Sequence, residues 1–187
     1  MCRSIRILLV LLVLFSQSLL VAREDSTLTS ANLRALLQSK VGQMSNLGIG
    51  KFQTVWVGEE IPNDLFTETL ANLATLSGRS LTRREGVAVI YFVGEDNLTR
   101  HLIKVGILRD LAIIDQQAFL TFSSLEHLFV VVQFPLMDQY GNYRLEVVAI
   151  QYLNRDTVRK INWELGIALM IQILPEVSDL FTWLNDF

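Results

Sequence analysis

The chain has 187 residues, 51% of them hydrophobic and 19% charged, and its net charge is −3 at pH 7. This composition excludes a disordered chain, which lacks the apolar surface needed to offset its conformational entropy. A mildly acidic domain also has no electrostatic reason to hold a phosphate backbone, so nucleic acid is not expected among its partners.

Residues 1–22 have the layout of an export signal. Arg3 and Arg6 precede the unbroken apolar run 7–15, and small residues follow at Ser16 and Ser18, which is the order of a signal peptide. The alternative is an uncleaved anchor, although a span needs about 20 apolar residues. The protein is therefore predicted to be exported, either periplasmic or secreted, or held at the inner membrane by residues 7–22 alone.

Cys2, the single cysteine, lies inside this segment. The rest of the chain then has no residue for a disulfide, a thiolate zinc site or a cysteine nucleophile. Small secreted animal domains tend to be rich in cysteine, so a bacterial envelope compartment is favoured.

After a polar linker at 23–30, residues 31–187 are predicted to form one α+β domain. Ser30 is the expected N-cap of a first helix that closes near Gly48, and 52–57 is rich in β-branched and aromatic residues, as in a strand. An apolar stripe over 65–76 predicts a second helix, stopped by Gly78. A basic loop at 79–86 follows. Residues 87–93 are almost all apolar, which predicts a central strand covered on both faces.

Beyond a turn at 94–97, the alternation over 98–105 predicts a strand that forms a hairpin with 87–93. Residues 111–114 and 118–122 are apolar runs without an assignment. Residues 127–137 and 143–153 predict a further hairpin, with Pro135 at an edge or bulge because proline cannot donate to the ladder.

The C-terminal third is predicted to be helical. A helix from Asp156, capped by that residue or by Asn154, should end at Pro175, and 176–187 should form a last short amphipathic helix. The fold class is therefore α+β, with a mixed or mainly antiparallel sheet and helices packed on it.

The sequence contains no glycine-rich phosphate loop, no Gly-x-Ser-x-Gly elbow and no His-Glu-x-x-His helix. His101 and His127 are its only histidines, and neither belongs to a motif that imposes a chemical role. No cofactor or metal is expected, and no catalytic residue can be named.

Two groups of residues are candidates for interaction. Arg79, Arg83 and Arg84 form a local basic cluster that could contact an anion or a partner. The stripe in the last predicted helix suggests a docking element for a protein partner or a second copy; it consists of Val177, Leu180, Phe181, Trp183 and Leu184.

The leading functional hypothesis is an exported envelope protein that acts as a non-enzymatic binding or assembly module. The alternative is a hydrolase-type enzyme with a carboxylate- or histidine-based pocket. A pocket that gathers a histidine with a carboxylate would favour the enzyme, whereas a flat apolar patch around Phe181 and Trp183 would favour the binding module.

Overall fold

A computed structural model of the protein describes residues 27–97, 99–137, 140–184 and 187. The predicted export signal, residues 1–22, lies outside the described residues and stays a prediction. Among the helices that are described, none is both long enough and apolar enough to cross a membrane. The described elements are, in chain order, α2 (Ser30–Val41), β1 (Phe52–Val57), η1 (Gly58–Glu60), η2 (Leu65–Leu70), α3 (Ala71–Leu76), β2 (Val87–Val93), α4 (Arg100–Thr121), β3 (His127–Met137), β4 (Tyr143–Asn154), α5 (Arg155–Val158), η3 (Trp163–Leu165), α6 (Ile167–Val177) and β5 (Leu180–Trp183).

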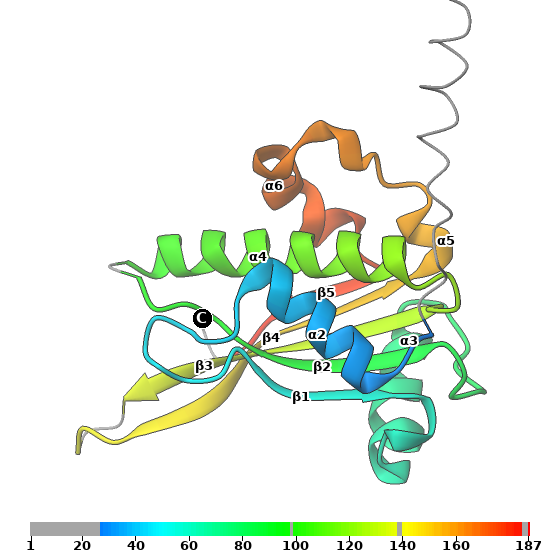
Figure 1. Ribbon diagram of the computed structural model, residues 1–187, viewed down its shortest axis with the longest axis horizontal. Helices are drawn as coiled ribbons and strands as arrows, with labels where there is room; N and C mark the ends of the chain where they lie inside the picture. Colours follow the sequence, from blue (N-terminus) through cyan, green and yellow to red (C-terminus); the bar gives the residue numbers. More distant parts are fainter. Residues whose placement is uncertain (1–26, 98, 138–139, 185–186) are drawn as a thin grey trace, which may run out of the picture.

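The strands form one five-stranded mixed sheet in the order β1-β2-β3-β4-β5. Strand β2 runs parallel to β3, and the other neighbouring pairs are antiparallel. Helices α2, α4 and α6 cover one face of this sheet, while η2 and α3 lie on the other (Figure 1). The fold is therefore α+β with a mixed sheet, as the sequence predicts.

Strand β2 is central, which confirms the prediction from its apolar run. Six of its seven residues are buried, and their side chains alternate between two cores. Ala88, Ile90 and Phe92 contribute to the larger core beneath α2 and α4, whereas Val87 and Val89 join the smaller core beneath η2 and α3. A strand covered on both faces needs apolar residues at every position, and this explains the unbroken run.

The strand predicted over 98–105 is wrong, because α4 begins at Arg100. Thr99 caps this helix, since its hydroxyl accepts a hydrogen bond from the amide of Leu102 at 3.3 Å. The apolar runs left unassigned in the sequence continue the helix to Thr121. As a result β2 and β3 are joined by a helical crossover rather than a hairpin, which is why they are parallel.

The predicted hairpin of 127–137 with 143–153 is confirmed, because β3 and β4 pair along their whole lengths. Pro135 lies beyond the last β2 partner of β3, which is Gln133. On the β2 side, this part of β3 lies at the edge of the sheet. This is the position expected for a residue without an amide hydrogen.

Several N-cap and C-terminal predictions need correction. Thr29, not Ser30, caps α2, because its hydroxyl accepts from the Asn32 amide at 3.2 Å. The helix expected from Asp156 is divided into α5, η3 and α6, and Asn154 caps its first piece. Pro175 does not end α6, which runs on to Val177.

The predicted last helix, 176–187, is wrong as well, because Leu180–Trp183 form strand β5 against β4. The free edge of β4 offers a row of unpaired amide and carbonyl groups, and a short segment rich in aromatic residues satisfies them. This long-range pairing outweighs the helical spacing of the local sequence.

Candidate functional site

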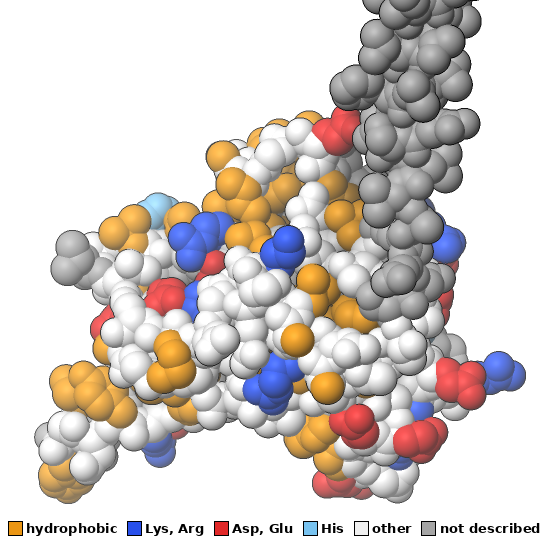
Figure 2. Space-filling model, viewed as in Figure 1, with side chains coloured by type: hydrophobic (Ala, Val, Ile, Leu, Met, Phe, Trp, Pro, Cys, Tyr) orange, Lys and Arg blue, Asp and Glu red, His pale blue; other side chains and the backbone are white. Residues whose placement is uncertain are grey.

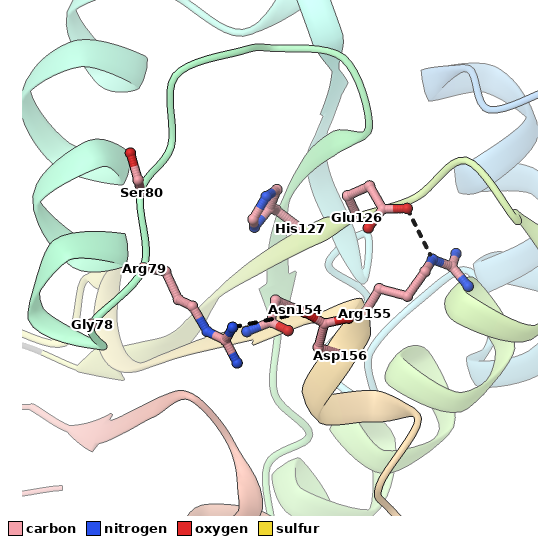
Figure 3. Close-up of a pocket in the computed structure, with 8 residues that line it drawn as sticks. All are labelled: Gly78, Arg79, Ser80, Glu126, His127, Asn154, Arg155 and Asp156. Carbon is pink, nitrogen blue, oxygen red and sulfur yellow. Dashed lines mark ion pairs between the residues drawn. The ribbon is translucent and has the colours of Figure 1, made fainter.

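A polar pocket of about 370 Å³ lies where the loop after α3 faces the start of β3 and the end of β4 (Figure 3). These segments meet because His127 and Asn154 are register partners and β2, which the loop leads into, is the other neighbour of β3. The pocket is lined by Gly78, Arg79, Ser80, Glu126, His127, Asn154, Arg155 and Asp156.

Arg79 is positioned by the end of α3. Gly78 has a φ of +72°, and the amide of Arg79 bonds the carbonyl of Ala74 at 2.8 Å while that of Gly78 bonds Thr75 at 2.9 Å. This is the Schellman arrangement, in which a left-handed glycine closes a helix and fixes the direction of the next residue. The glycine that ends the helix therefore also directs Arg79 towards the pocket.

The guanidinium of Arg79 is only loosely paired. Its nitrogen atoms lie 3.4 Å from Thr157 Oγ1, 3.5 Å from Asp179 Oδ1 and 3.8 Å from Asp156 Oδ2. Charge-assisted N–H···O bonds are usually about 2.7–2.9 Å long. Since the side chain of Arg79 is 33% exposed and that of Asp156 is 64% exposed, donors of this guanidinium remain available to a molecule in the pocket.

Asp179, by contrast, is saturated. Its carboxylate accepts hydrogen bonds at 2.7 Å from the amide of Asn154, from Asn154 Nδ2 and from the hydroxyl of Thr157. The side chain is only 6% exposed. Asp179 therefore provides a fixed negative charge behind Arg79 and joins the segment before β5 to the end of β4.

The imidazole of His127 lies between the loop that carries Ser80 and the side chain of Glu126 (Figure 3). Its Nδ1 is 2.9 Å from the hydroxyl of Tyr152, whose ring stacks on Phe129 at 4.4 Å. Burial lowers the pKa of His127 despite the nearby negative charges, and burial also raises the pKa of Tyr152 to about 12. At neutral pH both groups are uncharged, and the second ring nitrogen of His127 is not used by this bond.

Arg155 has a structural role. Its Nε lies 3.4 Å from Glu126 Oε1 and donates to the carbonyl of Leu125 at 2.6 Å, and its Nη2 donates to the carbonyl of Phe122. The guanidinium also lies over the ring of Phe119, 5.4 Å from its centroid. It therefore ties the start of α5 to the end of α4, and the carboxylate of Glu126 is directed towards it rather than towards His127.

Of the three predicted arginines, only Arg79 lines the pocket. Arg83 is exposed on the loop. Arg84 donates to the carbonyl of Ile61 and to Asn63 Oδ1, and it stacks over Phe66 at 4.8 Å, so it holds the loop on η2. Proximity in the sequence did not place the three side chains together.

The predicted docking stripe does not form a flat exposed patch. Its members are all partly buried; Val177, Phe181 and Trp183 pack on the larger core and Leu180 on the smaller. The amide of Leu184 bonds the carbonyl of Val148 at 2.8 Å. These residues hold the β5 segment on the sheet and take no part in the pocket.

Sequence reasoning named His127 and Arg79 separately but missed Asn154, Asp156 and Asp179 as parts of one site. Asn154 carried a signal, because its position before a helix marks it as a cap, and it does accept from the Thr157 amide at 3.0 Å. Asp179 carried none. His101 lies at the exposed start of α4, outside the pocket.

The pocket offers a cation and a neutral imidazole to a bound group, whereas the side-chain amide of Asn154 is occupied by Asp179 and Thr157. Within the described part of the chain, no cluster of three or more His, Cys, Asp or Glu residues could hold a metal ion. No protein-family model, curated protein or solved structure matches this chain.

Proposed function

We propose that the protein is an exported, non-enzymatic binding module, and that its pocket captures a carboxylate group through Arg79. The observation that carries this proposal is the loosely paired guanidinium. Asp179 fixes its position from behind at 3.5 Å but is itself saturated by shorter bonds. A planar fork of donors held in this way matches the geometry of a carboxylate.

Electrostatics favours a carboxylate over a phosphate. Arg79 and Arg155 are the cations of the lining, and Glu126 and Asp156 are its carboxylates, so the lining has no excess positive charge. Asp156 is exposed, and its carboxylate lies 3.8 Å from the guanidinium of Arg79. A ligand with a single negative charge can therefore take the place of Asp156 beside Arg79. A doubly charged phosphate would meet the remaining carboxylates without a second free cation.

His127 suits binding as well. Because burial lowers its pKa, the ring is neutral, and the nitrogen not bonded to Tyr152 can donate to or accept from a polar group beside the carboxylate. Such a ligand could be the carboxyl terminus or an acidic side chain of a partner protein, or a small organic acid. All of them present the same chemistry to Arg79.

The rival function is a hydrolase with His127 as base and Ser80 as nucleophile, since both residues line the pocket. A nucleophile must lie within hydrogen-bond reach of its base. In the described residues the hydrogen bond of the His127 side chain is to Tyr152, and the carboxylate of Glu126 is paired with Arg155. The geometry therefore supports binding better than acyl transfer.

The test is fluorescence polarisation with a pool of labelled tetrapeptides that end in a free carboxylate, set against the same peptides ending in an amide. Acetate and longer organic acids serve as competitors and distinguish a small-molecule ligand from a peptide. We expect the carboxylate peptides to bind the wild-type protein and the control Arg83→Gln, and to lose at least about tenfold in affinity with Arg79→Gln, since hydrogen bonds to charged groups contribute about 1.5–3 kcal/mol.

Arg79→Gln should keep the fold, because Asp179 retains three other donors, and circular dichroism checks this. Equal binding of the amide peptides, or unchanged affinity in the folded Arg79→Gln variant, would refute the proposal. Cleavage of the peptides, lost in His127→Gln, would establish the hydrolase instead.

A further inference from the structure

A second pocket, which we call the apolar pocket, lies between α5 and α6 and has a volume of about 370 Å³. Ligand pockets usually have volumes of about 300–1,000 Å³. Among the described residues that line it there is one cation, Lys160, and no carboxylate. The pocket therefore suits an apolar group that belongs to a neutral or negatively charged molecule. Its lining consists of Thr157, Lys160, Ile161, Asn162, Leu165, Ile173 and Val177.

The walls of the apolar pocket are held in place by the fold. Asn162 caps η3, because its side-chain oxygen accepts a hydrogen bond from the amide of Glu164 at 3.1 Å. This cap fixes the turn that carries Leu165, whose side chain is 44% exposed at the rim. The remaining apolar residues of the lining pack on the larger core, and they are Ile161, Ile173 and Val177.

The apolar pocket adjoins the polar pocket that contains Arg79. Asp156 lines the polar pocket, and Thr157, the next residue of α5, lines the apolar pocket. A guanidinium nitrogen of Arg79 lies 3.4 Å from Thr157 Oγ1. The cation proposed to hold a carboxylate therefore contacts a residue of the apolar pocket. The carboxylate and the side chain of a C-terminal residue leave the same Cα atom, so one residue can supply a group to each pocket.

Large apolar side chains continue from the apolar pocket onto α6. This helix buries only Met170 and Leu174, whereas Ile167 is 43% exposed and Leu169 is 39% exposed. Figure 2 shows hydrophobic side chains gathered where Figure 1 places α6. Grouped apolar residues of this kind are typical of a protein interaction surface. Because Ile167 and Leu169 lie outside the lining of the pocket, a ligand that covers them as well must be longer than a small organic acid.

We propose that the protein binds the C-terminal residue of a partner polypeptide, with the terminal carboxylate at Arg79 and a large apolar side chain in the apolar pocket. This inference rests on the proposed carboxylate-binding function and names the partner. The preceding residues of the partner contact the exposed side chains of Leu165 and Ile167. Lys160 adds positive charge to this surface, so acidic residues near the terminus of the partner are favoured over basic ones.

The proposal separates this partner from ligands that the carboxylate site alone would accept. Acetate and a carboxylate that ends in glycine carry the charge but leave the apolar pocket empty. A large apolar side chain that is fully removed from water strengthens binding by about tenfold or more. The identity of the last residue should therefore control the affinity.

The test is fluorescence polarisation with labelled tetrapeptides that differ only in their last residue, which is leucine, phenylalanine, glycine or serine. Each is prepared with a free carboxylate and with an amide. We expect the wild-type protein to bind the leucine and phenylalanine carboxylates at least about tenfold more tightly than the glycine and serine carboxylates, and to bind the amides weakly. As a competitor, N-acetyl-leucine should be at least about tenfold less effective than the leucine tetrapeptide, because it cannot reach α6.

Two variants locate the bound side chain. Leu165→Asp changes the apolar pocket, and Leu169→Asp is its matched control, since the two leucines are similarly exposed and only Leu165 lines the pocket. The quantity compared is the ratio of affinities for the leucine and glycine peptides, because a new charge acts alike on both carboxylates. We expect this ratio to fall to near one in Leu165→Asp and to stay at the wild-type value in Leu169→Asp.

The outcomes separate this proposal from the proposed function. Equal binding of all the carboxylate peptides, whatever their last residue, overturns the proposal and leaves carboxylate binding standing. So does an unchanged ratio in a Leu165→Asp variant that is folded by circular dichroism, and so does N-acetyl-leucine that competes as well as the tetrapeptide. If Leu165→Asp does not fold, the comparison of peptides on the wild-type protein decides alone. Failure of every carboxylate peptide to bind the wild type refutes the carboxylate function itself, and this inference with it.

Discussion

Asp115 should make the stability of this protein fall as the pH rises. It lies in the middle of α4 and is 0% exposed. Its Oδ2 accepts a hydrogen bond from Gln151 Nε2 at 2.9 Å. The same Gln151 nitrogen also donates to Ser178 Oγ at 3.1 Å. In the described residues neither Asp115 Oδ1 nor Gln151 Oε1 has a hydrogen-bond partner. Burial raises the pKa of Asp115 well above 3.8, and the bond from Gln151 only partly opposes this.

The sign follows from proton counting. Above pH 3.8, the ordinary pKa of the carboxyl, the unfolded chain releases this proton while the folded protein keeps it until the raised pKa is reached. Over that window the folded state binds one more proton, so the free energy of unfolding decreases by about 1.4 kcal/mol for each pH unit. For a chain of this size each kcal/mol corresponds to a change of about 2–4 °C in melting temperature.

The variant Asp115→Asn isolates this effect. Asparagine keeps an oxygen that can accept from Gln151 and adds an N–H₂ that can donate, but it does not titrate. We expect its unfolding free energy to equal or exceed that of the wild type above pH 5, and the contribution of about 1.4 kcal/mol per pH unit to disappear. The measurement is urea unfolding of both proteins at intervals of half a pH unit. Parallel stability curves for the two proteins would show that Asp115 does not hold its proton in the fold.

Three further changes test the packing by urea or thermal unfolding. Gly86→Ala should destabilise the protein by more than about 1–2 kcal/mol, because Gly86 has a φ of +72° and a Cβ would lie 2.6 Å from the carbonyl oxygen of Ser124; unchanged stability would show that this loop can move. Lys51→Met should cost about 1.5–3 kcal/mol, since it removes the buried ion pair of Lys51 Nζ with Asp110 at 3.0 Å and leaves that carboxylate paired with Arg109 alone; a neutral result would mean that Arg109 or water compensates for the lost ammonium. Ile90→Asp should prevent folding, because it buries a charge in the central strand, and a folded variant would contradict that burial.

The sequence determined the elements whose patterns are local. The apolar run of β2 and the turn-forming residues between β3 and β4 each predict one structure. A strand buried on both faces and a hairpin are both specified by patterns within about a dozen residues. Gly78 likewise marked the end of α3, because a left-handed residue is needed there whatever the rest of the chain does.

Elements that depend on distant partners were misread. The apolar residues over 98–105 fit a strand and one face of a helix equally well. Helix α4 forms because its apolar side chains pack in the larger core on the sheet. Leu180–Trp183 have helical spacing, yet they form β5 because the edge of β4 offers hydrogen bonds that an isolated short helix cannot replace.

The candidate site shows the same division. The sequence presented Arg79 and His127 as separate polar residues with no shared motif. Their approach is decided by the strand order, which places β3 between β2 and β4 and so sets His127 opposite Asn154. Asp179 reaches this site only because β5 pairs with β4. Local spacing fixes backbone conformation, but a site built from three distant segments exists only once the sheet has assembled.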